Sequence, residues 1–289
     1  MKEGLRKERK REKNGKKKNL DDFMEIIVLG TAANGRIPQS GCMKCRTCKA
    51  AIERGGPNKR TRSSILLKNG EKYTLVDANP DLGFQLEREM IPTTKISKIF
   101  LTHVHGDHYL GLFEFAGGRK LKVPVYSDKE ILDKIFGKGK VFDYFLSKEY
   151  NFTDPRGVKV NEKKNIDGLG VLPFGVPHAH RKAIGPTLGY KFFEKNRSLV
   201  YLPDIAEITA DVQEIINESD ILFFGAPLKD ESKWGHIALK SAIPILKKLK
   251  IGKVFFTHFD HAEPLHEELE NLVRPYGYYI AYDGMRVKL

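Results

Sequence analysis

The chain has 289 residues, of which 40% are hydrophobic, so it can bury one large core, and we expect a single main domain. It contains no apolar run of about 18 residues, and no apolar segment of about 7 to 15 residues follows its basic N-terminus. We therefore expect neither a membrane span nor a secretory signal, and we expect a cytoplasmic protein without a membrane partner.

The formal net charge of +13 is concentrated at the N-terminus, where the first 20 residues hold ten Lys or Arg and three Glu. A segment of this composition cannot bury apolar surface, so we expect residues 1–22 to form a basic disordered tail and residues 23–289 to form the domain. Three interpretations of the tail are open. It is a solubilising extension, it results from a start of translation assigned upstream of Met24, or it contacts nucleic acid.

The predicted domain begins with a β-branched run at residues 24–29, which ends at a glycine and is typical of a buried strand. A loop with Gly, Pro and Cys residues follows over residues 31–48, and a short helical stretch covers residues 50–54. Two further strands, at residues 64–68 and 73–76, are joined through Asn-Gly, which is the strongest short signal for a hairpin.

Strands and helices alternate over the rest of the chain. The remaining predicted strands cover residues 98–101, 123–126, 171–174, 188–193, 198–202, 221–224 and 253–256. The predicted helices cover residues 82–90, the segment after His108, and residues 128–136, 210–216 and 238–249. The chain is expected to end in a hairpin-like segment at residues 278–287. Such alternation is typical of a layered α/β domain.

The most informative segment directly follows a predicted strand and contains His103, His105, Asp107 and His108. The first two lie on the same side of an extended segment. Gly106 then permits a bend that can aim the last two at a second metal ion. Imidazole nitrogen with carboxylate oxygen suits Zn²⁺ best, and Mn²⁺ or Fe²⁺ are less favoured occupants of the same ligands. We therefore predict a two-metal site here.

This run resembles the H-x-H-x-D-H signature of the metallo-β-lactamase superfamily, and the resemblance extends over roughly residues 24–265. It implies a four-layer αβ/βα sandwich with the metal ions at one edge. It also implies three ligands further along the chain, namely a His, an Asp that bridges the ions and a late His. Asp204 and His258 each follow a predicted strand and are the candidates for the last two.

Two histidines, His178 and His180, are candidates for the intermediate ligand. His178 is favoured because it directly follows the Val-Pro pair that resembles the family's segment. His180 is then expected to contact a metal ligand without binding the metal itself. Asp77 resembles the superfamily's early Asp, which orients a ligand without binding metal, and an ordinary turn residue is the alternative. The resemblance thus places His103, His105 and His178 on one zinc ion, Asp107, His108 and His258 on the other, and Asp204 between them.

The three cysteines, Cys42, Cys45 and Cys48, are too few and too close for a disulfide framework, and their spacing suits a metal ion in a reducing compartment. A closed structural zinc site needs a fourth ligand, for which His261 is the natural candidate. A cysteine-rich loop and a late His-x-x-His also occur in the phosphodiesterase of the carbon-phosphorus lyase pathway, which this chain resembles, although that loop is spaced C-x-C-x-x-C. Reduced cysteines without metal are the alternative.

A second branch of the superfamily, coenzyme PQQ synthesis protein B, is similar over four short stretches, at residues 30–33, 37–39, 62–65 and 79–82. Many members of that family lack a full set of catalytic ligands, whereas this chain retains all of it. We therefore interpret the chain as an active hydrolase that shares the sequence framework of that family outside the catalytic ligands.

Together these features predict a di-zinc hydrolase, in particular a phosphodiesterase that activates water between two ions to cleave a small or cyclic phosphodiester. Positive charge and two metal ions suit such an anionic substrate.

Asp107 and His236 are the expected catalytic residues. His236 resembles a Gly-His that binds the phosphate or protonates the leaving oxygen in phosphodiesterase members, and a solvent-facing histidine is the alternative. A ribonuclease Z-like endonuclease and a PQQ-synthesis-protein-B-like binder or carrier are the other hypotheses, and a homodimer is the expected assembly.

Overall fold

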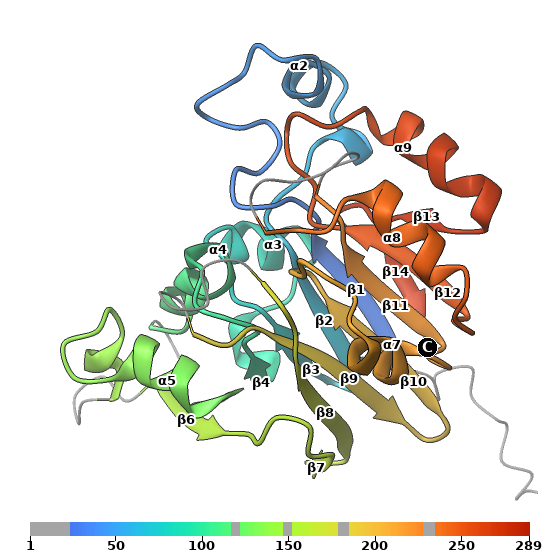
Figure 1. Ribbon diagram of the computed structural model, residues 1–289. Coiled ribbons are helices and arrows are strands. Elements are labelled where there is room, and N and C mark those ends of the chain that lie inside the picture. The colour runs from blue at the N-terminus through green and yellow to red at the C-terminus, as the bar shows by residue number, and fades with distance from the viewer. Residues whose placement is uncertain (1–23, 117–121, 147–151, 179–184, 228–234) are drawn as a thin grey trace, which may run out of the picture.

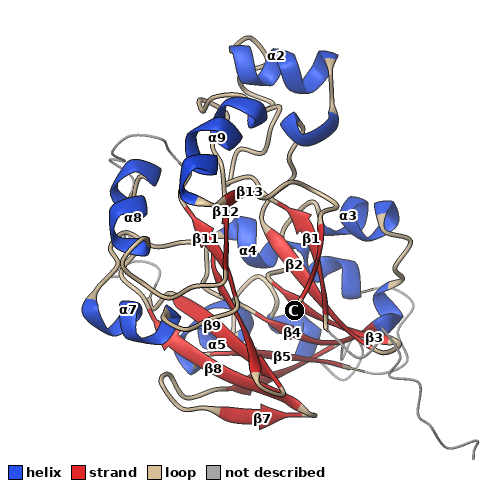
Figure 2. Cartoon of the chain, turned by 90° about the vertical axis from the view of Figure 1, so that its right-hand side faces the viewer, coloured by secondary structure: helices blue, strands red, loops and turns tan. Residues whose placement is uncertain are grey.

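The computed structural model describes residues 24–116, 122–146, 152–178, 185–227 and 235–289. The predicted tail and His180 lie outside these residues. Within them, two seven-stranded sheets face each other and helices cover their outer sides (Figure 1, Figure 2). This arrangement confirms the four-layer αβ/βα sandwich that the sequence predicts.

The first sheet has the strand order β14-β1-β2-β3-β4-β5-β6. Its strands are β1 (Glu25–Gly30), β2 (Ser64–Asn69), β3 (Lys72–Val76), β4 (Ile96–Phe100), β5 (Val123–Ser127), β6 (Thr153–Gly157) and β14 (Arg286–Lys288). The strands from β14 to β3 pair antiparallel, and those from β3 to β6 pair parallel. The predicted hairpin of β2 and β3 is confirmed.

The second sheet has the strand order β13-β12-β11-β10-β9-β8-β7. Its strands are β7 (Lys164–Ile166), β8 (Leu169–Gly175), β9 (Leu188–Glu194), β10 (Arg197–Leu202), β11 (Ile221–Gly225), β12 (Lys253–Thr257) and β13 (Tyr279–Ile280). The strands from β7 to β10 pair antiparallel, and those from β10 to β13 pair parallel.

Helices lie on both sides of the paired sheets (Figure 1). The α-helices of the described residues are α2 (Arg46–Glu53), α3 (Leu82–Arg88), α4 (Gly106–Tyr109), α5 (Lys129–Phe136), α7 (Ala210–Ile216), α8 (Leu239–Leu246) and α9 (His266–Val273). Short 3-10 helices are η1 (Gly56–Asn58), η2 (Thr93–Lys95), η3 (Leu110–Phe115), η4 (Asp143–Leu146) and η5 (Arg274–Tyr276). The apolar faces of α7, α8 and α9 pack on the second sheet, and those of α3 and α5 join the core of the first.

Strand β10 shows why the central strands are apolar along their length. Leu199 and Tyr201 belong to the core between the sheets, whereas Val200 and Leu202 belong to the core beneath α7 and α8. Because both faces of the sheet are covered, successive residues are all buried, and the strand does not alternate between apolar and polar residues.

The chain end is paired differently from the prediction. Residues 278–287 do not form a hairpin, because β13 pairs parallel with β12 in the second sheet and β14 pairs antiparallel with β1 in the first. The sequence pattern also does not predict β6, β7 or α9. Strand β6 lies at a sheet edge and contains Pro155, and a proline lowers the strand signal although edge strands tolerate it.

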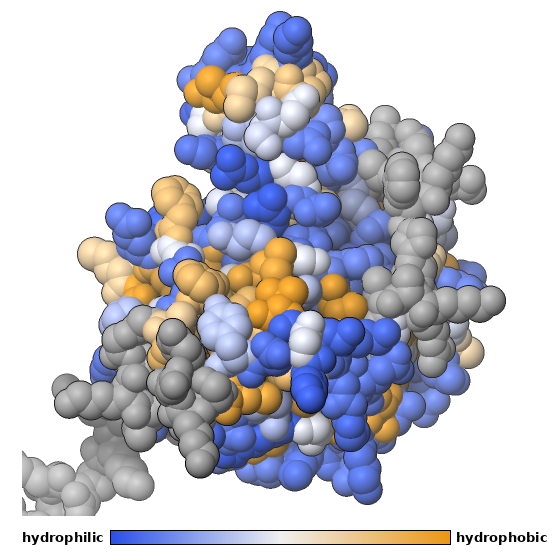
Figure 3. Space-filling view, turned by 90° about the vertical axis from the view of Figure 1, so that its left-hand side faces the viewer, coloured by the Kyte–Doolittle hydropathy of each residue, from blue (hydrophilic) through white to orange (hydrophobic). Residues whose placement is uncertain are grey.

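The described helices and the surface bear on whether the chain could contact a membrane. No helix among them is both long enough and apolar enough to cross a bilayer. Seen from the side where α4 and α5 lie, hydrophobic side chains form patches within a largely hydrophilic surface (Figure 3). Leu110 and Phe113 of η3 are among the exposed apolar residues.

Candidate metal centre

The candidate metal centre lies where strands of both sheets end. Asp77 and His103 follow β3 and β4 of the first sheet. Asp204 and His258 follow β10 and β12 of the second sheet. Because the carboxyl ends of parallel strands meet at the same edge of a sheet, the two sheets deliver polar side chains to one place.

Asp77 orients the side chains that come from the first sheet. Its buried carboxylate accepts hydrogen bonds from the backbone N of Thr102 at 2.9 Å and from Thr102 Oγ1 at 3.0 Å. The same carboxylate lies 2.8 Å from His108 Nδ1. His108 therefore donates its Nδ1 proton to Asp77, and its Nε2 is directed at the centre.

Asp204 occupies the middle of the cluster. Its Oδ1 lies 3.2 Å from His258 Nε2 and 3.7 Å from both His178 Nε2 and His236 Nδ1. Its Oδ2 lies 3.1 Å from His108 Nε2. A carboxylate with imidazole neighbours on both oxygens has the geometry to be shared by two ions.

The side chains form groups whose ligand atoms all lie within 4.8 Å of one another. The first group contains His103, His105, His178 and Asp204, the second Asp107, His108 and His258, and the third Asp204, His236 and His258. The structure thus brings together all the described residues that the sequence assigns to the two-metal site, and it places His236 beside them. Their roles as ligands stay predictions.

Burial and neighbouring charges set the protonation of these groups. Burial lowers the pKa of His103 well below its ordinary value, and the nearby His108 lowers it further. Burial alone would raise the pKa of Asp204, but His258 and His108 outweigh it and hold that pKa well below its usual range. A neutral imidazole and an ionised carboxylate are the forms that bind metal ions.

His108 shows that the cluster attracts positive charge. Burial would lower its pKa, but the carboxylates of Asp107, Asp204 and Asp77 raise it well above the ordinary value. In addition, His108 Nε2 and Asp204 Oδ2 lie 3.1 Å apart without the geometry of a hydrogen bond, and they and the buried His236 Nδ1 have no hydrogen-bond partner among the described residues. Unpaired buried polar atoms are costly, so this set of donors fits a bound cation.

His178 lies between the cluster and a cavity. Its Nδ1 donates a hydrogen bond to the backbone O of Gly235 at 3.0 Å, so its Nε2 faces the cluster, 3.4 Å from His105 Nδ1. A cavity of about 520 Å³ adjoins His178, and its wall includes Thr187 and Thr209. This cavity provides room for a small molecule beside the candidate ligands.

His236 is neutral in this setting. Burial lowers its pKa to about 3, against the opposing effect of the Asp204 carboxylate and with a further contribution from His258. A neutral imidazole donates one hydrogen bond through its N–H and does not act as a cation. Of the two roles that the sequence suggests, binding of a phosphate oxygen therefore fits His236 better than proton donation.

The cysteines gather with His261 at a separate place. The ligand atoms of Cys42, Cys45, Cys48 and His261 all lie within 4.8 Å of one another, and the cysteines are free thiols. His261 Nδ1 lies 3.6 Å from Cys45 Sγ and 3.8 Å from Cys48 Sγ. Hydrogen bonds from the backbone of Cys45 and Lys44 lower the pKa of Cys42 to about 6. Three thiols and an imidazole are a set typical of closed zinc sites.

Comparison with known proteins identifies the family. A family model described as "Beta-lactamase superfamily domain" matches residues 72–259, which include the candidate residues of the two-metal site from Asp77 to His258. The chain belongs to the beta-lactamase superfamily.

Relatives within the superfamily cover the chain almost completely. Coenzyme PQQ synthesis protein B of Methylobacterium nodulans is 27% identical in an alignment of 308 positions that covers 92% of this chain and 100% of the relative. The crystal structure of Zn(2+)-bound PqqB from Methylobacterium extorquens has a TM-score of 0.82 at 25% identity and covers 92% of this chain and 100% of that one. A diphosphatase from the PhnP family has a TM-score of 0.76 at 28% identity, covering 92% and 97% of the two chains. Human tRNase Z, short form, shares the fold, with a TM-score of 0.66 at 18% identity over 91% of this chain and 98% of its own.

One residue of this superfamily site is not predicted from the sequence. The Oγ of Ser63 lies 3.2 Å from His258 Nδ1 and donates its own hydrogen to the backbone O of Ala32 at 3.0 Å. Ser63 therefore accepts the Nδ1 proton of His258, and His258 Nε2 faces Asp204. Ser63 lies in a stretch that resembles PQQ synthesis protein B, but nothing local indicates which histidine it contacts.

Proposed function

We propose that this chain is a zinc-dependent hydrolase that cleaves a small phosphodiester. The observation that carries the proposal is the convergence of seven imidazole and carboxylate groups from both sheets around Asp204, where buried polar atoms have no hydrogen-bond partner among the described residues. The zinc reported for PqqB supports the metal, and the activity named for the PhnP-family diphosphatase supports hydrolysis at a phosphoryl group.

The proposed ligands follow the two sequence-predicted sets. His103, His105 and His178 would hold one ion, Asp107, His108 and His258 the other, and Asp204 would touch both. Zinc suits these nitrogen and oxygen ligands, and Mn²⁺ or Fe²⁺ would fit the same set. When bound, two such ions lower the pKa of water held between them and polarise a phosphoryl oxygen.

The chain's own groups would position the substrate. Among the described residues, the wall of the cavity beside His178 carries the hydroxyls of Thr187 and Thr209 and no carboxylate, lysine or arginine. Such a wall suits a small neutral alcohol portion of a phosphodiester, while the charged phosphoryl group lies at the histidines. His236 would donate a hydrogen bond to a phosphoryl oxygen.

Turnover of model substrates tests this proposal. Zinc-loaded protein is expected to hydrolyse bis(p-nitrophenyl) phosphate faster than p-nitrophenyl phosphate, because the diester carries a single negative charge near the buried carboxylates. Asp204→Asn is expected to lower this rate by at least about 100-fold, since it removes the shared carboxylate. Asp211→Asn, an exposed carboxylate on α7, is the matched control and should leave the rate unchanged. Cleavage of thioesters or lactams with no cleavage of diesters would contradict the proposal.

A second candidate is a binder or carrier in cofactor synthesis. It is favoured by the relatives named coenzyme PQQ synthesis protein B, which match over their full length. Zinc retained in full with no turnover of any ester would support this role over hydrolysis. A ribonuclease Z-like activity is supported by likeness of fold alone.

A further inference from the structure

A second cavity, of about 570 Å³, lies at the end of the sandwich where the hairpin of β2 and β3 turns. Its volume falls within the range of small-molecule pockets. The candidate metal ligands follow the carboxyl ends of β3 and β4, whereas Lys72 and Ser97, which line this cavity, lie at the beginning of the same two strands. The cavity is therefore separate from the metal centre.

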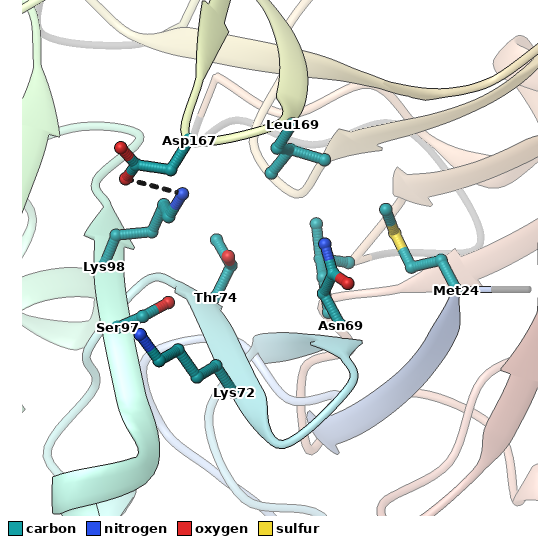
Figure 4. A pocket seen from close by; sticks show the side chains of 9 residues that line it. Met24, Asn69, Lys72, Thr74, Ser97, Lys98, Asp167 and Leu169 are labelled. Carbon is teal, nitrogen blue, oxygen red and sulfur yellow. Dashed lines mark ion pairs between the residues drawn. The ribbon is translucent and has the colours of Figure 1, made fainter. Parts of the chain in front are cut away.

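The interior wall of the cavity contains a buried lysine. Leu67, Thr74 and Lys98 are cross-strand neighbours on β2, β3 and β4, so their side chains share the face that looks toward the second sheet. Lys98 is only 4% exposed. Its Nζ donates to the backbone O of Ile166 at 2.9 Å and lies 2.9 Å from Asp167 Oδ2, both at the turn between β7 and β8 (Figure 4).

The charge and donors of the cavity suit an anion. Among the described residues that line it, two carry ammonium groups, Lys98 and Lys72, and one carries a carboxylate, Asp167. An ammonium group has three N–H donors, and the described residues accept from two of those on Lys98. The amide of Asn69 and the hydroxyl of Thr74 are further donors around the open space (Figure 4).

Three apolar side chains also line the cavity. Met24, Leu67 and Leu169 line it beside the charged groups. Apolar walls with a few convergent polar groups are typical of sites for small organic molecules. The Asp167 carboxylate is 70% exposed, so solvent is available to it when it leaves Lys98.

We propose that this cavity binds a small organic carboxylate with an apolar body. The ligand's carboxylate lies between Lys98 and Lys72, where it replaces the contact of Asp167, and its apolar body packs on Met24, Leu67 and Leu169. In this arrangement Asp167 competes with the ligand for Lys98.

Benzoate is the probe, and benzamide, which has the same shape without the charge, is its neutral control. Binding to zinc-loaded protein labelled with ¹³C at the methionine methyl groups is followed through the signal of Met24, which Met24→Leu assigns. Benzoate is expected to shift this signal saturably, and benzamide is not. A signal from Met24 reports this cavity and is insensitive to benzoate bound at the metal centre.

Variants at the cavity separate ligand binding from a purely structural ion pair. Lys72→Ala is expected to weaken benzoate binding by about two- to five-fold, and Asp167→Asn to tighten it by about two- to five-fold, as expected for partly exposed charge pairs. Lys68→Ala is the matched control, because Lys68 is not among the lining residues and its ammonium pairs with Glu25 at 3.6 Å. No saturable shift at Met24, an equal shift with benzamide, or an affinity that neither variant changes would overturn the proposal.

Discussion

Three imidazoles of the metal centre are each held by a partner on the ring nitrogen that faces away from it. The pairs are His108 with Asp77, His178 with the backbone O of Gly235, and His258 with Ser63. Such partners select one tautomer, orient the ring and make the other nitrogen a better ligand. We therefore expect these partners to contribute to metal affinity without being ligands themselves.

Ser63→Ala tests this role at a residue that the sequence does not single out. We expect the variant to bind zinc at the two-metal site about 10- to 100-fold more weakly, because His258 loses the acceptor that fixes its tautomer. Competition with a chromophoric chelator measures the affinity, and circular dichroism monitors the fold. Ser97→Ala, whose hydroxyl donates to the backbone O of Tyr73, is the control. Unchanged zinc affinity in Ser63→Ala would show that the contact does not orient His258.

His236→Ala tests whether this histidine binds the phosphate or donates a proton. Since its low pKa keeps it neutral, we expect the variant to retain its metal and to lose about 10- to 100-fold in diester turnover, equally for good and poor leaving groups. His236→Gln, which keeps a hydrogen-bond donor, should recover part of the rate. A loss confined to poor leaving groups, of about 100- to 10,000-fold, would instead identify His236 as the general acid.

At the scale of elements, the cysteine cluster joins α2 to the segment before α9. Cys45 Sγ accepts a hydrogen bond from the backbone N of Cys48 at 3.3 Å, which caps the start of α2. Arg46 also pairs with Glu268 of α9 at 2.6 Å. This ion pair is exposed and contributes little. Thr47 Oγ1 of α2 donates a buried hydrogen bond to the backbone O of Glu263. A zinc ion shared by the cysteines and His261 would add a further link between these two elements.

Cys45→Ala is expected to lose about one equivalent of zinc and to unfold at a lower temperature. Structural zinc contributes to the free energy of folding, and a loss of about 2 kcal/mol would lower the melting temperature of a domain of this size by about 4–8 °C. Elemental analysis and a thermal melt measure both quantities, with Lys44→Ala in the same loop as the control. Unchanged metal content and melting temperature would rule out a zinc site at the cysteines.

At the scale of the whole molecule, the metal centre and the second cavity both depend on how the two sheets face each other. Asp204 of the second sheet lies 3.1 Å from His108 of the first, and Lys98 of the first sheet contacts Asp167 at the edge of the second. Neither contact follows from the pattern of a single strand. Each exists only where the two sheets pack together.

The sequence by itself determined the fold class and the residues between His103 and His108. Strand and helix periodicity and a compact run of ligands are local patterns. They can be recognised without knowing how distant parts of the chain pack. Helix α7 (Ala210–Ile216) begins and ends where its pattern predicts. Asp204 and His258 are candidates from the sequence because the family resemblance implies such ligands and each follows a predicted strand, but their meeting is a property of the second sheet.

Only the tertiary structure decided which distant residues meet. Ser63 contacts His258 across 195 residues, and the cavity at Lys98 combines β2, β3 and β4 with the turn after β7. The pairing of β13 and β14 in different sheets was decided in the same way, because two short strands near each other in sequence also suit a hairpin. Periodicity shows which side of a strand is buried. The neighbour that covers it is selected by the packing of the whole chain, which local sequence does not encode.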